Sequence, residues 1–171
     1  EHRTSSAQEN QVDLAPQADI RFFYLSPGGS QIAWISTEDF IEVRSLDSQD
    51  IVASIPIPTV AISLTNSLGE ISMQEETGQI DALALNLDGN TLAGAYCSQR
   101  SRVSVPGTND FIDTCLDREI LVWELPAGEL SKRISTGQAS AIRSLAFKPD
   151  DQNILAVGYQ DASIRIWDVD Q

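Results

Sequence analysis

Apolar and polar residues alternate along most of this chain, in short stretches separated by turn-forming residues. Three segments repeat the same order of an apolar-rich strand, a turn and a second strand: residues 20–36, 80–96 and 142–159. The turns are built on Pro, Gly or Asp, which fix φ or accept the backbone angles of a tight hairpin. Alternation of this kind predicts half-buried strands, and no long window shows helical periodicity. The sequence therefore predicts an all-β protein.

A third and a fourth strand are expected after these hairpins. The third is expected over residues 40–46, 119–125 and 163–169, and the fourth over residues 51–58 and 130–135. Four antiparallel strands, repeated along a chain, make up a β-propeller blade. We therefore predict three blades, at about residues 20–58, 80–135 and 142–171, within a propeller segment 11–171 that follows a polar N-terminal tail at 1–10.

Two tryptophans mark the repeat most clearly. Trp123 and Trp167 stand in the third strands of the second and third copies and lie 44 positions apart, inside the roughly 40–45-residue period of a WD-repeat blade. Together with Asp161 and Asp168 they form a pattern that resembles the WD-repeat family, with the third copy closest to it and the first degenerate. The resemblance implies a β-propeller that serves as a protein-interaction scaffold.

The chain departs from the family pattern before its inner strands. WD repeats typically carry a Gly-His pair there, whose His joins a hydrogen-bonded network with the Trp and a loop Asp. Here Gly137-Gln138 and Gly78-Gln79 stand at that place, and the only histidine is His2. We therefore do not expect the standard network, and expect aromatic packing by Tyr96 and Tyr159 to replace part of it.

Two insertions lengthen the spacing between equivalent positions of the first two copies. Arg44 and Trp123, at equivalent positions, are 79 residues apart, about 35 more than the two tryptophans. Residues 59–78, where a small extra hairpin is expected, and residues 98–116, between the second and third strands of blade two, absorb the excess. Because adjacent strands alternate in direction, both insertions are expected on one face of the disc.

Long loops on a rigid scaffold are where binding tends to reside. The second insertion carries charged and polar side chains beside an aromatic one, which is a plausible anchor for a partner. The candidate partner contacts are Arg100, Arg102, Asn109, Asp110 and Phe111. The alternative is neutral drift in loop length.

Cys97 and Cys115 are the only cysteines, and they bracket the second insertion. Strand ends paired across a hairpin can bring two Cα atoms within disulfide range, so we favour a disulfide between them. It would close a loop of about 17 intervening residues and stabilise the fold by roughly 3 kcal/mol. It would also place the domain in an oxidising, extracytoplasmic compartment. The alternative is two unrelated thiols in a cytoplasmic protein.

The charge of the chain limits its partners. Eleven basic residues stand against 25 acidic ones, a formal net charge of −14. This field repels nucleic-acid phosphates and anionic lipids, and no apolar run reaches the roughly 18 residues of a membrane span. We therefore expect a protein partner and neither nucleic acid nor membrane insertion. The acidic residues are scattered, which favours a solvated surface over a dedicated basic partner.

The residues that catalysis would need are scarce. With His2 as the only histidine, neither a Ser-His-Asp or Cys-His arrangement nor a His-ligated metal site is expected. Two cysteines cannot complete a structural zinc site, and no glycine-rich phosphate loop is followed by a helix. Glu75-Glu76 and Asp150-Asp151 are neighbours in turns or linkers, where they are usually solvated. We predict no catalytic residue, cofactor or metal.

Three blades are fewer than the four to eight of a closed ring, so the end blades would expose apolar faces. Two interpretations remain open: further blades lie in a longer native chain, or two copies form a six-bladed ring in which residues 11–15 of each complete the other's third blade. The predicted function is a non-catalytic scaffold that binds through the face carrying the insertions. The alternative is an extracytoplasmic ligand-sensing domain of a larger signalling protein, with a small molecule or glycan on that face.

Overall fold

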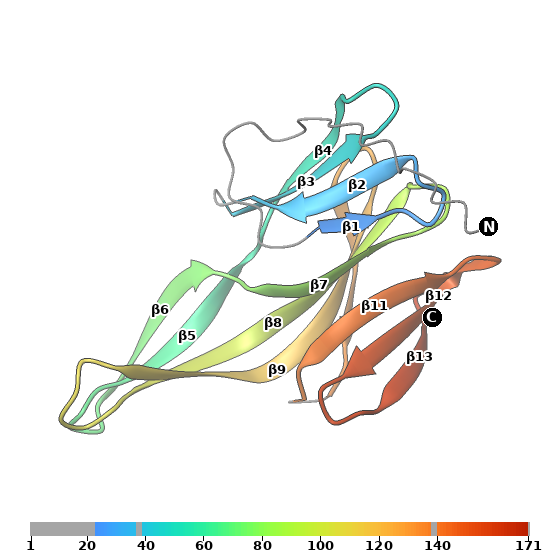
Figure 1. The fold of residues 1–171 in the computed structure, drawn as a ribbon. Coiled ribbons are helices and arrows are strands. Elements are labelled where there is room, and N and C mark those ends of the chain that lie inside the picture. The colour runs from blue at the N-terminus through green and yellow to red at the C-terminus, as the bar shows by residue number, and fades with distance from the viewer. Residues whose placement is uncertain (1–22, 37–38, 138–139, 171) are drawn as a thin grey trace, which may run out of the picture.

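A computed structural model describes residues 23–36, 39–137 and 140–170 of the chain. These residues form strands and turns only, which confirms the all-β prediction (Figure 1). The predictions made for the tail at 1–10, for residues 11–15 and for Gln138 fall outside the described residues. Within the described part, no helix has the length and apolar character to cross a membrane.

The first sheet corresponds to the predicted first blade. Its four antiparallel strands follow chain order: β1 (Phe23–Leu25), β2 (Gln31–Ile35), β3 (Phe40–Ser45) and β4 (Ile51–Pro56). The β1–β2 turn closes with Ser26 and Gln31 hydrogen-bonded through their backbones at 2.9 Å. Gly29 in this turn has a φ of 70°, a conformation that favours glycine because it has no Cβ.

The second and third sheets hold the other two blades. Blade two consists of β7 (Ile80–Leu85), β8 (Thr91–Ser104), β9 (Phe111–Glu124) and β10 (Glu129–Ser135). A hairpin of β5 (Thr59–Thr65) and β6 (Ile71–Thr77) joins the same sheet along β8. Blade three consists of β11 (Ile142–Lys148), β12 (Asp151–Tyr159) and β13 (Ile164–Asp168).

Blade two is buried on both faces because the other two sheets pack against it. Along β9, Leu121 and Trp123 belong to the core shared with blade one. Ile120 and Val122 belong to the core shared with blade three. Successive side chains of a strand point to opposite faces, so one unbroken apolar run supplies both cores. This accounts for a run of apolar residues in β9 where a half-buried strand would alternate.

On the face of blade one that points away from blade two, Trp34 is covered, at 1% exposure, but the inner strand β1 is bare. Phe23 and Leu25 in β1 are 58% and 54% exposed. Leu83 and Leu85 occupy the equivalent positions of β7 and are buried against blade one, at 0% and 2% exposure. The same pattern of side chains is therefore covered in one repeat and uncovered in the other.

Blade three is bare on its opposite face. Ile164 and Ile166 in β13 are 75% and 65% exposed. The equivalent residues of β9, Ile120 and Val122, are buried under blade three at 0% and 3%. Both ends of the three-blade stack thus present side chains that elsewhere in this chain form the contact between blades.

Candidate functional site

A four-stranded extension, which we call the arm, leaves the second blade (Figure 1). It consists of β6, β5, residues 100–104 of β8 and residues 111–115 of β9, in that order across the sheet. β5 runs parallel to β8, with Ile62 opposite Arg100 and Thr65 opposite Val103. The two insertions therefore lie side by side, and the hairpin expected in the first one is present.

The second insertion is a pair of strands, whereas we expected a long loop. β8 and β9 continue past the blade as one antiparallel ladder that ends at Ser104 opposite Phe111. The chain reverses at Pro106-Gly107, where Gly107 has a φ of 81° and the Thr108 N–H donates to the Val105 carbonyl at 3.3 Å. Pro followed by Gly at these positions is typical of a type II turn. This local signal was present in the sequence.

A disulfide joins the two strands where the arm begins. Cys97 and Cys115 are bonded with an S–S distance of 2.07 Å and a Cα–Cα distance of 5.9 Å, the pairing that the sequence favoured. The bond spans the one irregular part of the β8–β9 ladder, where the register shifts between Cys97 and Arg100. It therefore reinforces the arm at the point where backbone pairing is interrupted.

Tyr96 ties the base of the arm to the blade. Its hydroxyl donates to the carbonyl of Thr59 at 2.8 Å, and burial raises the pKa of this hydroxyl. The Gly78 N–H donates to the Pro58 carbonyl at 2.9 Å. A Cβ on Gly78 would collide with the Tyr96 ring and lie 2.7 Å from the Pro58 oxygen. The β5–β6 hairpin is thus held at both of its ends.

Two arginines on the arm are engaged within the chain. The Arg102 guanidinium contacts Asp113 at 2.7 Å and Glu76 at 2.8 Å. Arg100 lies 3.3 Å from Asp113 and 3.8 Å from Glu76. The hydrogen bond from Arg102 holds the pKa of Asp113 below its usual range and raises that of Arg102. This cluster links β6, β8 and β9.

The five candidate contacts therefore divide into two groups. Arg100 and Arg102 lie in β8 with side chains only 14% and 25% exposed and paired with acidic residues. Asn109 and Asp110 lie in the turn at the tip, and Phe111 begins β9 at 62% exposure. Of the five, the residues at the tip are the ones that a partner would reach.

Sequence reasoning missed a group of apolar side chains on one side of the arm. Strand pairing aligns Ile71, Thr65, Val103 and Ile112 in a row across the four strands, and paired residues share a face. Met73 lies two residues further along β6 on the same face. We call this side the outer face, and the side that carries the arginine cluster the inner face.

The repeat signature lies in the cores and in a turn. Trp123 is 2% exposed, and Trp167 packs partly buried against the core shared by blades two and three. The Trp167 indole nitrogen is buried without a hydrogen-bond partner among the described residues. Asp161 instead accepts hydrogen bonds from the hydroxyl and N–H of Ser163, which lower its pKa. Asp168 accepts from the Asp170 N–H at 2.9 Å.

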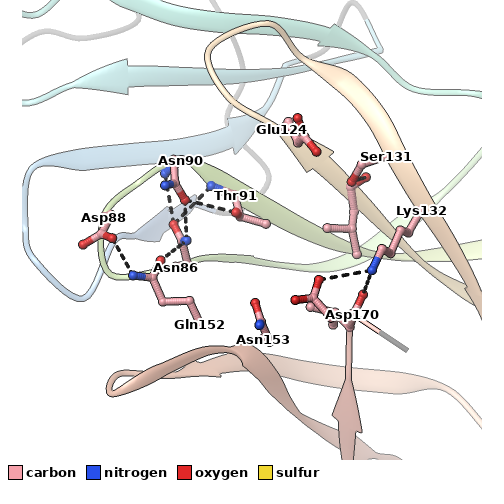
Figure 2. Close-up of a pocket in the computed structure, with 12 residues that line it drawn as sticks. Asn86, Asp88, Asn90, Thr91, Glu124, Ser131, Lys132, Gln152, Asn153 and Asp170 are labelled. Carbon is pink, nitrogen blue, oxygen red and sulfur yellow. Dashed lines mark hydrogen bonds and ion pairs between the residues drawn. The ribbon is translucent and has the colours of Figure 1, made fainter.

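A polar cleft lies between blades two and three (Figure 2). Its volume of about 360 Å³ falls in the size range of small-molecule sites. Asn86 accepts from the N–H groups of Asn90 and Thr91 and donates to Gln152, while Lys132 donates to Asp170. These polar groups satisfy one another across the contact between the two blades.

The cleft opens beside the β7–β8 turn, whereas the arm leaves from the other ends of the same strands. The cleft and the arm therefore lie at opposite ends of the strands of blade two. Among the described residues, no three His, Cys, Asp or Glu side chains are grouped so as to hold a metal ion.

Comparisons with known proteins agree with this geometry. Residues 130–168 match the family model described as WD domain, G-beta repeat. Over 90 residues, the chain is 31% identical to WD repeat-containing protein 90 of Mus musculus, an alignment that covers 52% of this chain and 4% of that protein.

Two similar solved structures are those titled "Crystal structure of RRP9 WD40 repeats" and "Structure of U3-55K". Their TM-scores are 0.57 and 0.56, each at 20% identity over 90% of this chain. The chain spans 36% and 37% of their lengths. At this identity the likeness shows the fold alone, which is that of propeller blades.

Removing Arg102 should restore an ordinary pKa to Asp113. In Arg102→Gln, the guanidinium hydrogen bond that stabilises the carboxylate is lost, so the pKa of Asp113 should rise from its lowered value. NMR titration of side-chain carboxyl carbons measures this. Because the pKa is lowered in the folded state, the stabilisation should be present above the unfolded pKa and disappear as the pH falls through the folded one. Arg133→Gln, which affects a pair with Glu119, should leave Asp113 unchanged; an equal rise would contradict the assignment.

Replacing both cysteines should destabilise the chain without changing its fold. The double variant Cys97→Ser/Cys115→Ser should lose about 3 kcal/mol of unfolding free energy, because the unfolded chain regains the freedom of the closed loop. Urea denaturation without reductant gives this value. Thiol titration of the unreduced, denatured wild type should find no free thiol. Two free thiols, or identical urea midpoints, would contradict the disulfide.

Proposed function

Because this chain is built from WD-repeat propeller blades, we propose that it is a non-catalytic scaffold for protein–protein interaction and that the arm is its contact surface. WD-repeat domains typically act as interaction scaffolds, and every similar protein reported above is named for such repeats or has a propeller fold of this kind. The net charge of −14 argues against nucleic acid as the partner.

The observation that carries the proposal is the structure of the arm itself. It is a sheet held by the disulfide, by Tyr96 and by the arginine cluster, so its exposed side chains are displayed on a rigid support. Phe111, Ile112 and Ile71 are each more than half exposed on it. Preorganised apolar side chains bind a partner with little loss of conformational entropy.

The two ends of the three-blade stack each leave apolar side chains uncovered. We infer that further blades of the same kind cover Phe23 and Leu25 at one end and Ile164 and Ile166 at the other, because the equivalent positions are buried between blades within the chain. Two sources of these blades are open: a longer native chain, or a second copy that completes a six-bladed ring. In either case the arm would project from an assembled ring.

A second candidate function has one observation in its favour. The disulfide supports an extracytoplasmic compartment, as the ligand-sensing alternative requires. The polar cleft between blades two and three would then be the ligand site. The cleft lies at the end of the strands opposite the arm. The ligand-sensing alternative had instead placed the ligand on the side that carries the insertions.

Shortening the arm should abolish partner capture. A variant that lacks residues 100–113 keeps Cys97 and Cys115 and joins Gln99 to Thr114 in a short turn, so the blades should remain folded. Affinity capture from the source cells, read by mass spectrometry, should lose the partners that the wild type retains. Asn153→Ala in the cleft on the opposite face is the control and should capture normally. If the shortened, folded variant captured the same partners and Asn153→Ala lost them, the cleft would replace the arm as the site.

A further inference from the structure

The two faces of the arm differ in chemistry, as the register of its strands shows. On the inner face, Arg102 lies opposite Leu64 and Asp113, and Arg100 lies opposite Ile62 and Cys115. Ile62 is fully buried in the core shared by blades one and two. The inner face is thus a continuation of the protein core, closed off by the arginine cluster.

The outer face is apolar and uncovered. Ile71 is 72% exposed, Met73 67%, Ile112 59% and Val103 41%. They belong to three different strands of one sheet and line the same face, with Thr65 of β5 between the residues of β6 and those of β8 and β9. Exposed apolar patches of this kind mark interaction sites in folded proteins. Small hydroxyl side chains occupy neighbouring positions on the same face, including Thr65 and Thr114.

The charged side chains beside the outer face are acidic. Glu75 follows Met73 by two residues on β6, so the alternation places it on the outer face, and Asp110 lies two residues before Ile112 in the turn at the tip. Neither carboxylate forms an ion pair among the described residues. The only basic residues of the two insertions are Arg100 and Arg102, and both are held on the inner face by Glu76 and Asp113.

We propose that the outer face of the arm receives an amphipathic helix of a partner protein, with its apolar side on Ile71, Met73, Val103 and Ile112 and with Lys or Arg on its flanks. The proposal rests on the arm being the contact surface and names the chemistry of what binds there. Basic flanks would meet Glu75 and Asp110, which have no cation of their own.

The dimensions of the arm fit such an occupant. Four strands spaced by about 4.8 Å make a face roughly 14 Å wide, and a helix with its side chains is about 10–12 Å across. Helix on sheet is one of the standard layer arrangements by which an apolar sheet face is covered. A second copy of this chain is disfavoured as the occupant of this face, because the acidic groups beside one outer face would meet those of the other and find no cation there.

A synthetic peptide of about 18 residues, with Leu at helical spacing on one side and Lys elsewhere, is the probe. Fluorescence anisotropy at physiological salt should show binding to the 171-residue chain, weakened about tenfold or more in Ile71→Thr/Ile112→Thr. These substitutions remove apolar contact, keep the charge and suit a strand. A Leu–Glu peptide with the same pattern should not bind, and a Leu–Lys peptide with its leucines scattered around the helix should bind at least tenfold less tightly.

The matched control is Ile164→Thr/Ile166→Thr on the bare face of blade three, at similar exposure, and it should bind like the wild type. Equal binding by the wild type and the arm variant would overturn the proposal, since general charge attraction would then explain it. A dimer in light scattering that is lost in the arm variant would also overturn it, in favour of a second copy. If the Leu–Lys peptide did not bind, but partner capture still required residues 100–113, the proposal of a helical occupant would be refuted. The proposed scaffold function would then be unaffected.

Discussion

The packing of one apolar sheet face against the next is the interaction on which this structure depends. β9 shows it most directly, because Leu121 and Trp123 contribute to one core while Ile120 and Val122 contribute to the other. A sheet buried on both faces needs a neighbour on each side. Blade two has both neighbours, and each end blade has one. The exposed apolar side chains at the two ends of the stack follow from this single requirement.

The arm is stabilised differently from the blades. Beyond its base, no second sheet of the described residues packs on it, and its cohesion comes from the paired strands, the Cys97–Cys115 bond and the ion pairs of Arg102. This frees one face from any role in the core. The blades thus provide a rigid support, while the arm provides an apolar surface whose shape does not depend on ring closure.

The sequence predicts the blade strands well because alternation and turn residues are local signals, and β10 and β13 lie within a residue of the stretches expected. Two features of the arm are not evident from these local signals. Val103 and Ile112 each follow or precede a charged residue, as in an exposed loop, and only the turn at Pro106-Gly107 brings their two segments together as strands. The parallel pairing of β5 with β8 joins residues 37 to 38 positions apart, and periodicity within one segment cannot show which strand edges meet. The apolar outer face depends on that pairing.

The most direct test of the stacking constraint is the molar mass of this 18.6 kDa chain in solution, measured by light scattering across a range of concentrations. Uncovered blade faces should associate, as a stable dimer or as a mass that rises with concentration. The association should be lost in Leu25→Asp/Ile166→Asp, which places charge on both faces. A wild-type chain that remained monomeric at every concentration would contradict the prediction that these faces associate, and would exclude a second copy as the source of the covering blades.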